Sequence, residues 1–192
     1  IGNRHVKQNQ GDDVIPLPVG YTFPSVFTPK YQQDVEDNAK KMFSELGIEN
    51  GMMFMQCKVE KGTCFVYDIG YRLTGSMEYK LFDKVAGYNP LKMLINFALT
   101  GKMTDEDISA KFDPTKLRPC YNVSCLCAPG TIARIEGCDE LKESEGVIDF
   151  ILTHYPGDTI TEEMRGLLTQ ITVRVLGYVN SKEELCDAMQ FI

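Results

Sequence analysis

The sequence has no run of apolar residues long enough to cross a membrane. A spanning helix needs roughly 18 such residues in a row, and the longest candidate, Pro90 to Thr100, is interrupted by Lys92 and Asn96. Nothing at the start of the chain resembles a signal peptide. Of the 192 residues, 43% are hydrophobic and 24% are charged, as in globular proteins that bury a core. We expect a cytoplasmic protein without membrane contact.

A cluster of Lys and Arg is also missing. The net charge is −7 at pH 7, whereas binding to nucleic acids depends on grouped basic side chains that neutralise phosphates. No nucleic acid is therefore expected among the partners.

Signatures of several enzyme classes are absent. There is no Gly-rich loop of Walker type and no other nucleotide-binding fingerprint, and neither Ser76 nor Ser124 stands in a nucleophile-elbow context. The two histidines, His5 and His154, have no partner at the spacing of catalytic or metal-binding residues. A serine hydrolase, a Walker-type ATPase and histidine-based catalysis are all disfavoured.

The seven cysteines allow two interpretations. Cys125 and Cys127 form a CxC pair, which together with Cys120 or Cys138 could supply a zinc site. No CxxC pair is present, however, and cytosolic proteins keep their thiols reduced. We therefore favour reduced, mostly buried cysteines over a zinc site.

The first 27 residues predict an extended, loop-like segment, because they contain three glycines and three prolines. A helix then begins, with Thr28 as its N-cap and Pro29 in its first turn, and Gly47 ends it. The apolar face of this helix consists of Val35, Ala39, Met42, Phe43 and Leu46.

Two apolar-rich runs, Met52 to Glu60 and Thr63 to Ile69, predict a β-hairpin. Gln56 and Asp68 face the same way only if they form a cross-strand pair. A three-residue loop, Lys61-Gly62-Thr63, gives that pairing, whereas a two-residue loop shifts the register by one residue. We expect the three-residue loop.

Further helices are predicted after the hairpin. One covers about Pro90 to Leu99, and Thr104 to Asp107 form the N-terminal box of a short helix. The segment Phe112 to Thr115 marks a domain boundary, so we expect one domain over residues 1–112 and a second over residues 113–192. The buried face of the helix over Pro90 to Leu99 is expected to contain Leu91, Leu94, Ile95, Ala98 and Leu99.

The second domain alternates short strands with Gly, Pro and Asp turns. Asp139 to Glu145 predict a solvated turn, and Ser181 to Glu184 form a capping box that begins the last helix. Together with the first domain this makes an α+β fold. The expected strands are Tyr121 to Leu126, Gly130 to Ile135, Gly146 to Leu152 and Ile171 to Tyr178.

The hairpin carries the strongest candidate site. Asp68 lies in an apolar strand, where a carboxylate is costly unless it pairs with a cation or a metal. Arg72 follows four residues later, and Gln56 lies in the middle of the first strand. Ligands tend to bind at strand ends and in the loops after them. The alternative, which these residues alone leave open, is a structural ion pair between Asp68 and Arg72.

This region resembles the closing hairpin of ATP-grasp ligases. Gly51 to Val59, then Gly62, then Phe65 to Arg72 are similar to the hairpin of biotin carboxylase, the carbamoyl phosphate synthase large subunit and glycinamide ribonucleotide synthetase-type enzymes. Gly87 to Leu91 and Ala98 to Lys102 resemble the family's final helix. Segments similar to the β-rich C-terminal domain of biotin carboxylase-like enzymes are Gly130 to Gly137, Gly146-Val147, Tyr155 to Asp158 and Gly177 to Val179.

The resemblance implies the C-terminal half of an ATP-grasp domain, an antiparallel sheet with packed helices, followed by a small β-rich C-terminal domain. It implies ATP and Mg²⁺ as cofactors and a small carboxylate substrate that is activated as an acyl-phosphate. The family's N-terminal ATP-grasp lobe, with its nucleotide-binding lysines, would precede residue 1. We therefore expect a piece of a longer enzyme or half of a split one, inactive alone, and the first residue, Ile1, agrees with this. Association into a homo-oligomer stays open.

The resemblance also implies roles for single residues. Asp68 matches the principal metal-binding acid, and Arg72 matches the arginine that contacts substrate or acyl-phosphate. Gln56 stands where a metal-binding Glu is usual, and Gly70 stands where Asn is usual, so one Mg²⁺ held by Asp68 and Gln56 with the ATP phosphates is expected. Ser76 and Glu78 are candidate substrate contacts, although Glu78 could equally be a surface charge.

These two departures support an alternative function. A protein that keeps the fold but has lost metal ligands would be a non-catalytic binding or regulatory module. Asp68, Arg72 and the intact loop Leu73 to Ser76 favour the ligase.

Overall fold

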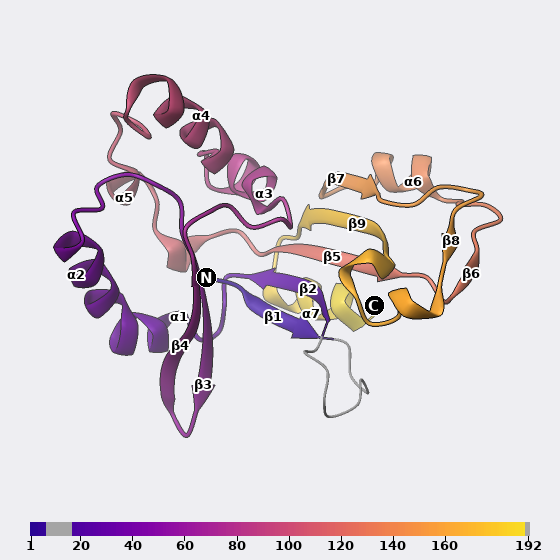
Figure 1. Ribbon diagram of the computed structural model, residues 1–192, viewed down its shortest axis with the longest axis horizontal. Coiled ribbons are helices and arrows are strands. Elements are labelled where there is room, and N and C mark those ends of the chain that lie inside the picture. The colour runs from indigo at the N-terminus through magenta and orange to yellow at the C-terminus, as the bar shows by residue number, and fades with distance from the viewer. Residues whose placement is uncertain (7–16, 191–192) are drawn as a thin grey trace. The chain divides into compact units, whose positions relative to one another are not determined.

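The computed structural model describes residues 1–6 and 17–190, which form helices and antiparallel sheets (Figure 1). The α+β fold class predicted from the sequence is confirmed. The chain divides into two compact units, one made of Ile1 with Pro24–Leu117 and the other of Gly2–Phe23 with Arg118–Ile192. In the described part of the chain, no helix is both long and apolar enough to cross a membrane.

The first unit begins with one nearly continuous helical stretch. It consists of α1 (Thr28–Tyr31), the π-helix η1 (Gln32–Glu36) and α2 (Asp37–Glu45). The sequence predicted a single regular helix here, and the π-helical turn was not foreseen. A π-helix widens the backbone by one residue per turn and shifts the side chains that follow.

Both ends of this stretch are set by local hydrogen bonds. The N-cap is Phe27, so the prediction of Thr28 was wrong: the Thr28 hydroxyl donates to the Ser25 carbonyl oxygen at 2.9 Å instead of capping the helix. The prediction for the other end is confirmed. Gly47 has a φ of +68°, and its N–H donates to the Ser44 carbonyl oxygen at 3.0 Å, as in a glycine-terminated helix.

The predicted hairpin is confirmed, with strands β3 (Phe54–Glu60) and β4 (Thr63–Gly70). The prediction of a three-residue loop was wrong, because Glu60 pairs with Thr63 and only Lys61 and Gly62 lie between them. Both have positive φ, 50° and 78°. This is the geometry of the tight turns that match the twist of a hairpin, and Lys61 adopts it although it is not glycine.

A β-bulge restores the pairing that the loop does not provide. Cys57 pairs with Val66, but the next residue of β3, Gln56, pairs with Asp68, so Tyr67 is an extra residue in β4. Side chains alternate between faces along a strand, and one extra residue moves every later side chain to the other face. Gln56 and Asp68 are therefore a cross-strand pair, as predicted, for a different reason.

The helical stretch covers one face of the hairpin. Val35, Ala39 and Cys64 form the buried centre of this contact. The Asp34 carboxylate accepts the Cys64 N–H at 2.7 Å and pairs with Lys30 Nζ at 2.9 Å, which occupies a backbone donor of β4. The partly buried residues packed around the centre are Tyr31, Phe43, Met55, Val59 and Val66.

Three helices complete the first unit: α3 (Glu78–Val85), α4 (Pro90–Thr100) and α5 (Ile108–Lys111), with a 3-10 turn, η2, at Pro114–Lys116. The helices predicted near residues 90 and 108 are confirmed. The predicted buried face of α4 was wrong, because Ile95 is 52% and Leu99 is 79% exposed. An apolar stripe shows which residues can be buried, and the described part of the chain leaves these two uncovered.

The second unit is built on a five-stranded antiparallel sheet of order β1-β2-β5-β9-β7. The residues expected to be loop-like at the start of the chain supply two of its strands. Cys120, Val123 and Leu176 are at most 2% exposed and form the centre of the sheet. The bounds are β1 Asn3–Val6, β2 Pro18–Phe23, β5 Cys120–Leu126, β7 Val147–Leu152 and β9 Ile171–Tyr178.

Short elements surround this sheet. The strand predicted over residues 130–135 is only β6 (Gly130–Thr131), paired with β8 (Thr159–Ile160). The predicted acidic turn is the helix α6 (Cys138–Glu143). The last helix, α7 (Lys182–Gln190), is confirmed with its cap, because the Glu184 N–H donates to Ser181 Oγ at 3.1 Å. Two 3-10 turns are η3 (Glu162–Met164) and η4 (Leu168–Gln170).

The contact between η1 and β4 should make stability depend on pH. The Cys64 N–H first, and Lys30 next, lower the pKa of Asp34 in the folded protein. Since the unfolded chain has the higher pKa, this stabilisation is present above the ordinary Asp value and is lost as the pH falls through the lower folded value. In urea denaturation, Asp34→Asn should lower the midpoint at pH 7 and converge with the wild type in strong acid. The exposed Asp37→Asn is the control, and equal effects of the two would contradict the assignment.

Candidate functional site

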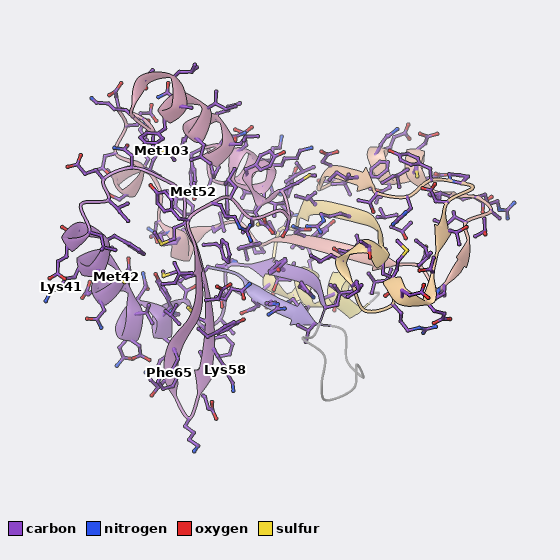
Figure 2. All side chains as sticks on the ribbon, viewed as in Figure 1. Lys41, Met42, Met52, Lys58, Phe65 and Met103 are labelled. Carbon is purple, nitrogen blue, oxygen red and sulfur yellow. The ribbon has the colours of Figure 1, made fainter. Side chains whose placement is uncertain are left out.

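The paired residues Gln56 and Asp68 lie on the face of the hairpin opposite the helices. Val59 and Cys64 form a directly paired position on the helix-covered face, and alternation places Gln56 on the other one. The pair Lys58 and Phe65, labelled near the turn in Figure 2, shares this uncovered face. Phe65 is 55% exposed. The uncovered face of the hairpin thus presents the Asp68 carboxylate and the Gln56 amide together with the exposed Phe65 ring.

Asp68 and Arg72 do not form an ion pair. The Asp68 side chain is exposed and makes no hydrogen bond or ion pair with the residues that the structure describes. The Arg72 guanidinium lies over the Phe54 ring, with Cζ 4.6 Å from the ring centroid, and its Nη1 donates to the Leu73 carbonyl oxygen at 2.9 Å. The alternative of a structural ion pair is therefore not supported, and the carboxylate keeps its oxygens for a ligand.

Gly70 is the cross-strand partner of Phe54. A Cβ atom built on Gly70 would lie 2.0 Å from Phe54 Cε1, so the ring occupies the space that a side chain would take. Aromatic residues commonly pack over a glycine in this way in antiparallel sheets. Phe54 was not among the residues singled out from the sequence; its position opposite a strand glycine is the signal that could have found it.

The loop after β4 is held by a buried carboxylate. Glu78, the first residue of α3, is 7% exposed and accepts a hydrogen bond from the Thr74 hydroxyl. The interpretation of Glu78 as a surface charge was wrong. Ser76 lies between these two residues, next to Met77, which adopts a left-handed φ of +64° that is uncommon outside glycine. The two predicted substrate contacts are thus on one short, internally bonded loop.

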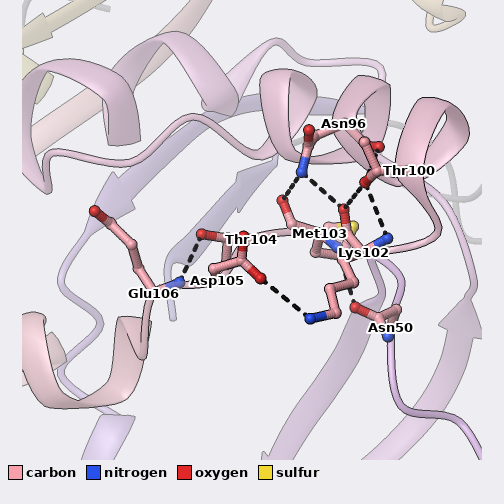
Figure 3. Close-up of polar contacts among 8 residues, drawn as sticks. All are labelled: Asn50, Asn96, Thr100, Lys102, Met103, Thr104, Asp105 and Glu106. Atoms are coloured by element: carbon pink, nitrogen blue, oxygen red, sulfur yellow. Dashed lines mark hydrogen bonds and ion pairs between the residues drawn. The ribbon is translucent and has the colours of Figure 1, made fainter.

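A second network connects the residues before β3 and after β4 with the segment that follows α4, and Figure 3 shows its contact between Asn50 and Met103. The Tyr71 hydroxyl donates to the Asn50 carbonyl oxygen, and Asn50 Oδ1 accepts the Met103 N–H at 3.1 Å. Gly51 makes room for this contact, because a Cβ there would lie 1.9 Å from the Tyr71 oxygen. The residue beside Arg72 is therefore tied to the segment after α4, which the sequence did not indicate.

The histidines have structural partners. His5 Nε2 lies 2.8 Å from Thr22 Oγ1 on the neighbouring strand, and burial lowers the pKa of His5. His154 Nε2 lies 2.8 Å from the Thr169 carbonyl oxygen. Both contacts are the kind that a structural histidine makes.

The cysteines show no metal centre. All seven are free thiols, and only Cys64 and Cys120 are buried, so the expectation of mostly buried thiols was wrong. No group of three or more His, Cys, Asp or Glu side chains suited to a metal occurs among the described residues. Cys57 is exposed by surface area, but partial desolvation, and next the neighbouring Cys64, raise the pKa of its thiol to about 11.

Comparison with known proteins gives matches among solved structures. No family model matches the sequence, and no curated protein matches it. An L-amino acid ligase from Bacillus licheniformis matches with a TM-score of 0.71 and 21% identity, over 90% of this chain and 41% of that one. A phosphoribosylglycinamide synthetase from Anaerococcus prevotii matches with a TM-score of 0.68 and 10% identity, over 100% and 46%. The biotin carboxylase domain of a thermophilic 2-oxoglutarate carboxylase, bound to bicarbonate, matches with a TM-score of 0.66 and 16% identity, over 97% and 39%.

These matches show the fold of the chain. The fold is an ATP-grasp fold in part, as the resemblance of the hairpin implied. The identities, 21% or less, show the fold alone, and the chain spans less than half the length of these relatives.

The donor set at the hairpin suits one magnesium ion. Mg²⁺ is usually held by one or two carboxylates together with water and substrate phosphates. Asp68 offers a carboxylate that no described residue engages, and Gln56, its cross-strand partner, offers an amide oxygen. Gly70 offers no side-chain oxygen at all. The residues present therefore fit a site that depends on phosphate oxygens to complete its coordination.

Thr74→Val should destabilise the first unit. The substitution keeps the shape of the side chain but removes a donor to the buried Glu78 carboxylate, and such a loss costs about 1–3 kcal/mol. Urea denaturation followed by circular dichroism measures the effect. The exposed Thr63→Val, on the same hairpin, should stay within about 0.5 kcal/mol of the wild type. An equally small effect of Thr74→Val would show that the contact does not hold the loop.

Proposed function

We propose that this chain is the C-terminal part of an ATP-dependent ligase that joins a small carboxylate to an amine or similar nucleophile through an acyl-phosphate. The observation that carries the proposal is the bulged hairpin, which pairs Gln56 with Asp68 and places Arg72 just beyond the end of β4, on an ATP-grasp fold. Solved structures with this fold include an L-amino acid ligase and a phosphoribosylglycinamide synthetase. One biotin carboxylase domain dimer, from Hydrogenobacter thermophilus, is a complex with MgADP and bicarbonate.

Each residue has a distinct role in this proposal. Asp68 and Gln56 would hold Mg²⁺, which when bound neutralises phosphate charge. Arg72 would contact the transferred phosphoryl group or the carboxylate, because its planar fork matches such oxygens. Ser76 would contact the substrate. Glu78 would act on the substrate only indirectly, by fixing the shape of the loop, since its carboxylate accepts a hydrogen bond from Thr74.

The proposed site needs groups beyond this chain. In the proposed enzyme an ATP-grasp lobe with phosphate-binding lysines completes the nucleotide site, and this chain alone is inactive. Homo-oligomerisation is compatible with the proposal but is not required by it.

A second function is supported by the chemistry of two positions. Gln56 is neutral and Gly70 has no side chain, so only Asp68 contributes charge to the cation site. A binding or regulatory module with an ATP-grasp fold would need no more charge at this site than that of Asp68. The two functions differ in whether Mg²⁺ strengthens nucleotide binding.

Asp68→Ala should abolish magnesium-dependent nucleotide binding. Removing the only carboxylate of the site is expected to weaken MgATP binding by about ten-fold or more, measured by calorimetry on the intact protein that contains this chain. Glu60→Gln is the matched control, because it removes an exposed charge at the turn end of the same hairpin. If wild-type affinity for ATP is the same with and without Mg²⁺, the protein is a binding module and the ligase proposal fails.

Gln56→Glu tests the same site in the opposite direction. A second carboxylate opposite Asp68 should tighten Mg²⁺ binding in the presence of ATP by about ten-fold, because a carboxylate is a stronger ligand for a hard cation than an amide. Mg²⁺ titration at constant ATP gives the affinity. Weaker Mg²⁺ binding in this variant would mean that the pair repels and does not share a cation.

A further inference from the structure

The Phe54 ring occupies the space that a side chain at position 70 would need. Phe54 and Gly70 are directly paired across the hairpin, and any Cβ at position 70 would fall within 2.8 Å of three ring atoms of Phe54. The backbone does not require glycine here, because Gly70 is not among the residues with positive φ. Glycine at this position therefore provides space, and the space is filled by the Phe54 ring.

The same ring supports Arg72. The guanidinium carbon lies 4.6 Å from the ring centroid, within the range of a cation–π contact. Nη1 is held by the Leu73 carbonyl oxygen at 2.9 Å, while Nε and Nη2 make no hydrogen bond to the described residues. One side of the guanidinium is thus fixed by a ring and a carbonyl, and the remaining N–H groups are available for an anion.

We propose that Phe54 is a positioning residue, which holds the Arg72 guanidinium ready for the anionic ligand of the site and requires a bare glycine at position 70 to do so. The identity of the ligand rests on the proposed function, whereas the stacking of Arg72 on Phe54 does not. A long, exposed arginine otherwise samples many rotamers, and a group ordered in advance loses less freedom when it binds. Glycine at position 70 supplies no metal-binding side chain, but it leaves the space that the Phe54 ring needs to order Arg72.

Arginine NMR tests the positioning. In protein labelled with ¹³C,¹⁵N-arginine, ring currents should shift the Arg72 δ and ε resonances in the wild type and in Phe54→Tyr, and Phe54→Leu should remove the shift. Gly70→Ala should also remove it, because the new methyl group displaces the ring. In a Phe54→Leu background Gly70→Ala should change these resonances no further. Unchanged resonances in Phe54→Leu, or independent effects of the two substitutions, would overturn the proposal.

MgADP titration tests whether the positioning serves the ligand. In the intact protein Phe54→Leu should weaken MgADP binding about two- to five-fold, the equivalent of one exposed cation–π contact, and Phe54→Tyr should restore it. In an Arg72→Ala background the same Phe54→Leu change should have no effect. If the wild type binds MgADP and Phe54→Leu binds it equally well, the positioning role fails and the proposed function stands. If the wild type does not bind MgADP, the proposed function fails, and with it the role of Phe54 toward this ligand.

Discussion

The candidate site depends on the one extra residue, Tyr67, that β4 carries relative to β3. The two-residue turn pairs Cys57 with Val66, and an uninterrupted ladder would then place Asp68 opposite Met55, on the face that packs against the helices. A carboxylate there would be buried against apolar side chains at high cost. The bulge moves Asp68 to the uncovered face and opposite Gln56. Without it, neither the pairing nor the exposed carboxylate would exist.

The hairpin also shows what the sequence could and could not predict. Its two strands follow from apolar periodicity, and a site that uses both Gln56 and Asp68 requires the two side chains to face one way. The predicted loop length was wrong, because a positive φ at Lys61 and one extra residue, Tyr67, in β4 are choices between nearly equal local geometries. The apolar stripe of α4 predicted its helix correctly but failed for Ile95 and Leu99, because burial depends on what packs against a side chain.

Gly70 leads to one conclusion when it is considered alone and to another when it is considered with its cross-strand partner, Phe54. Taken alone, a glycine where the family resemblance expects asparagine is a missing side-chain oxygen. Together with Phe54, it is one half of a contact in which the ring fills the vacated space and carries Arg72. The sequence contains both residues, but their relationship depends on register, which the bulge shifts by one. Site residues that act through a neighbour are therefore the ones that sequence reasoning missed: Phe54, Tyr71 and Asn50.

All of these devices lie within the first unit, between Asn50 and Glu78 and the segment near Met103. The bulge sets the face of Asp68, the ring over Gly70 sets the place of Arg72, and the buried Glu78 sets the loop that contains Ser76. Because each is local, the geometry of the acid, the arginine and the loop does not need a ligand to form it. The remaining determinant of the proposed function is charge: with glutamine opposite Asp68, the proposed cation site would have a single carboxylate, and its affinity would come largely from the phosphates of the nucleotide. In the proposed enzyme, metal and nucleotide binding would then be coupled, so that the site would load its cation only with its nucleotide.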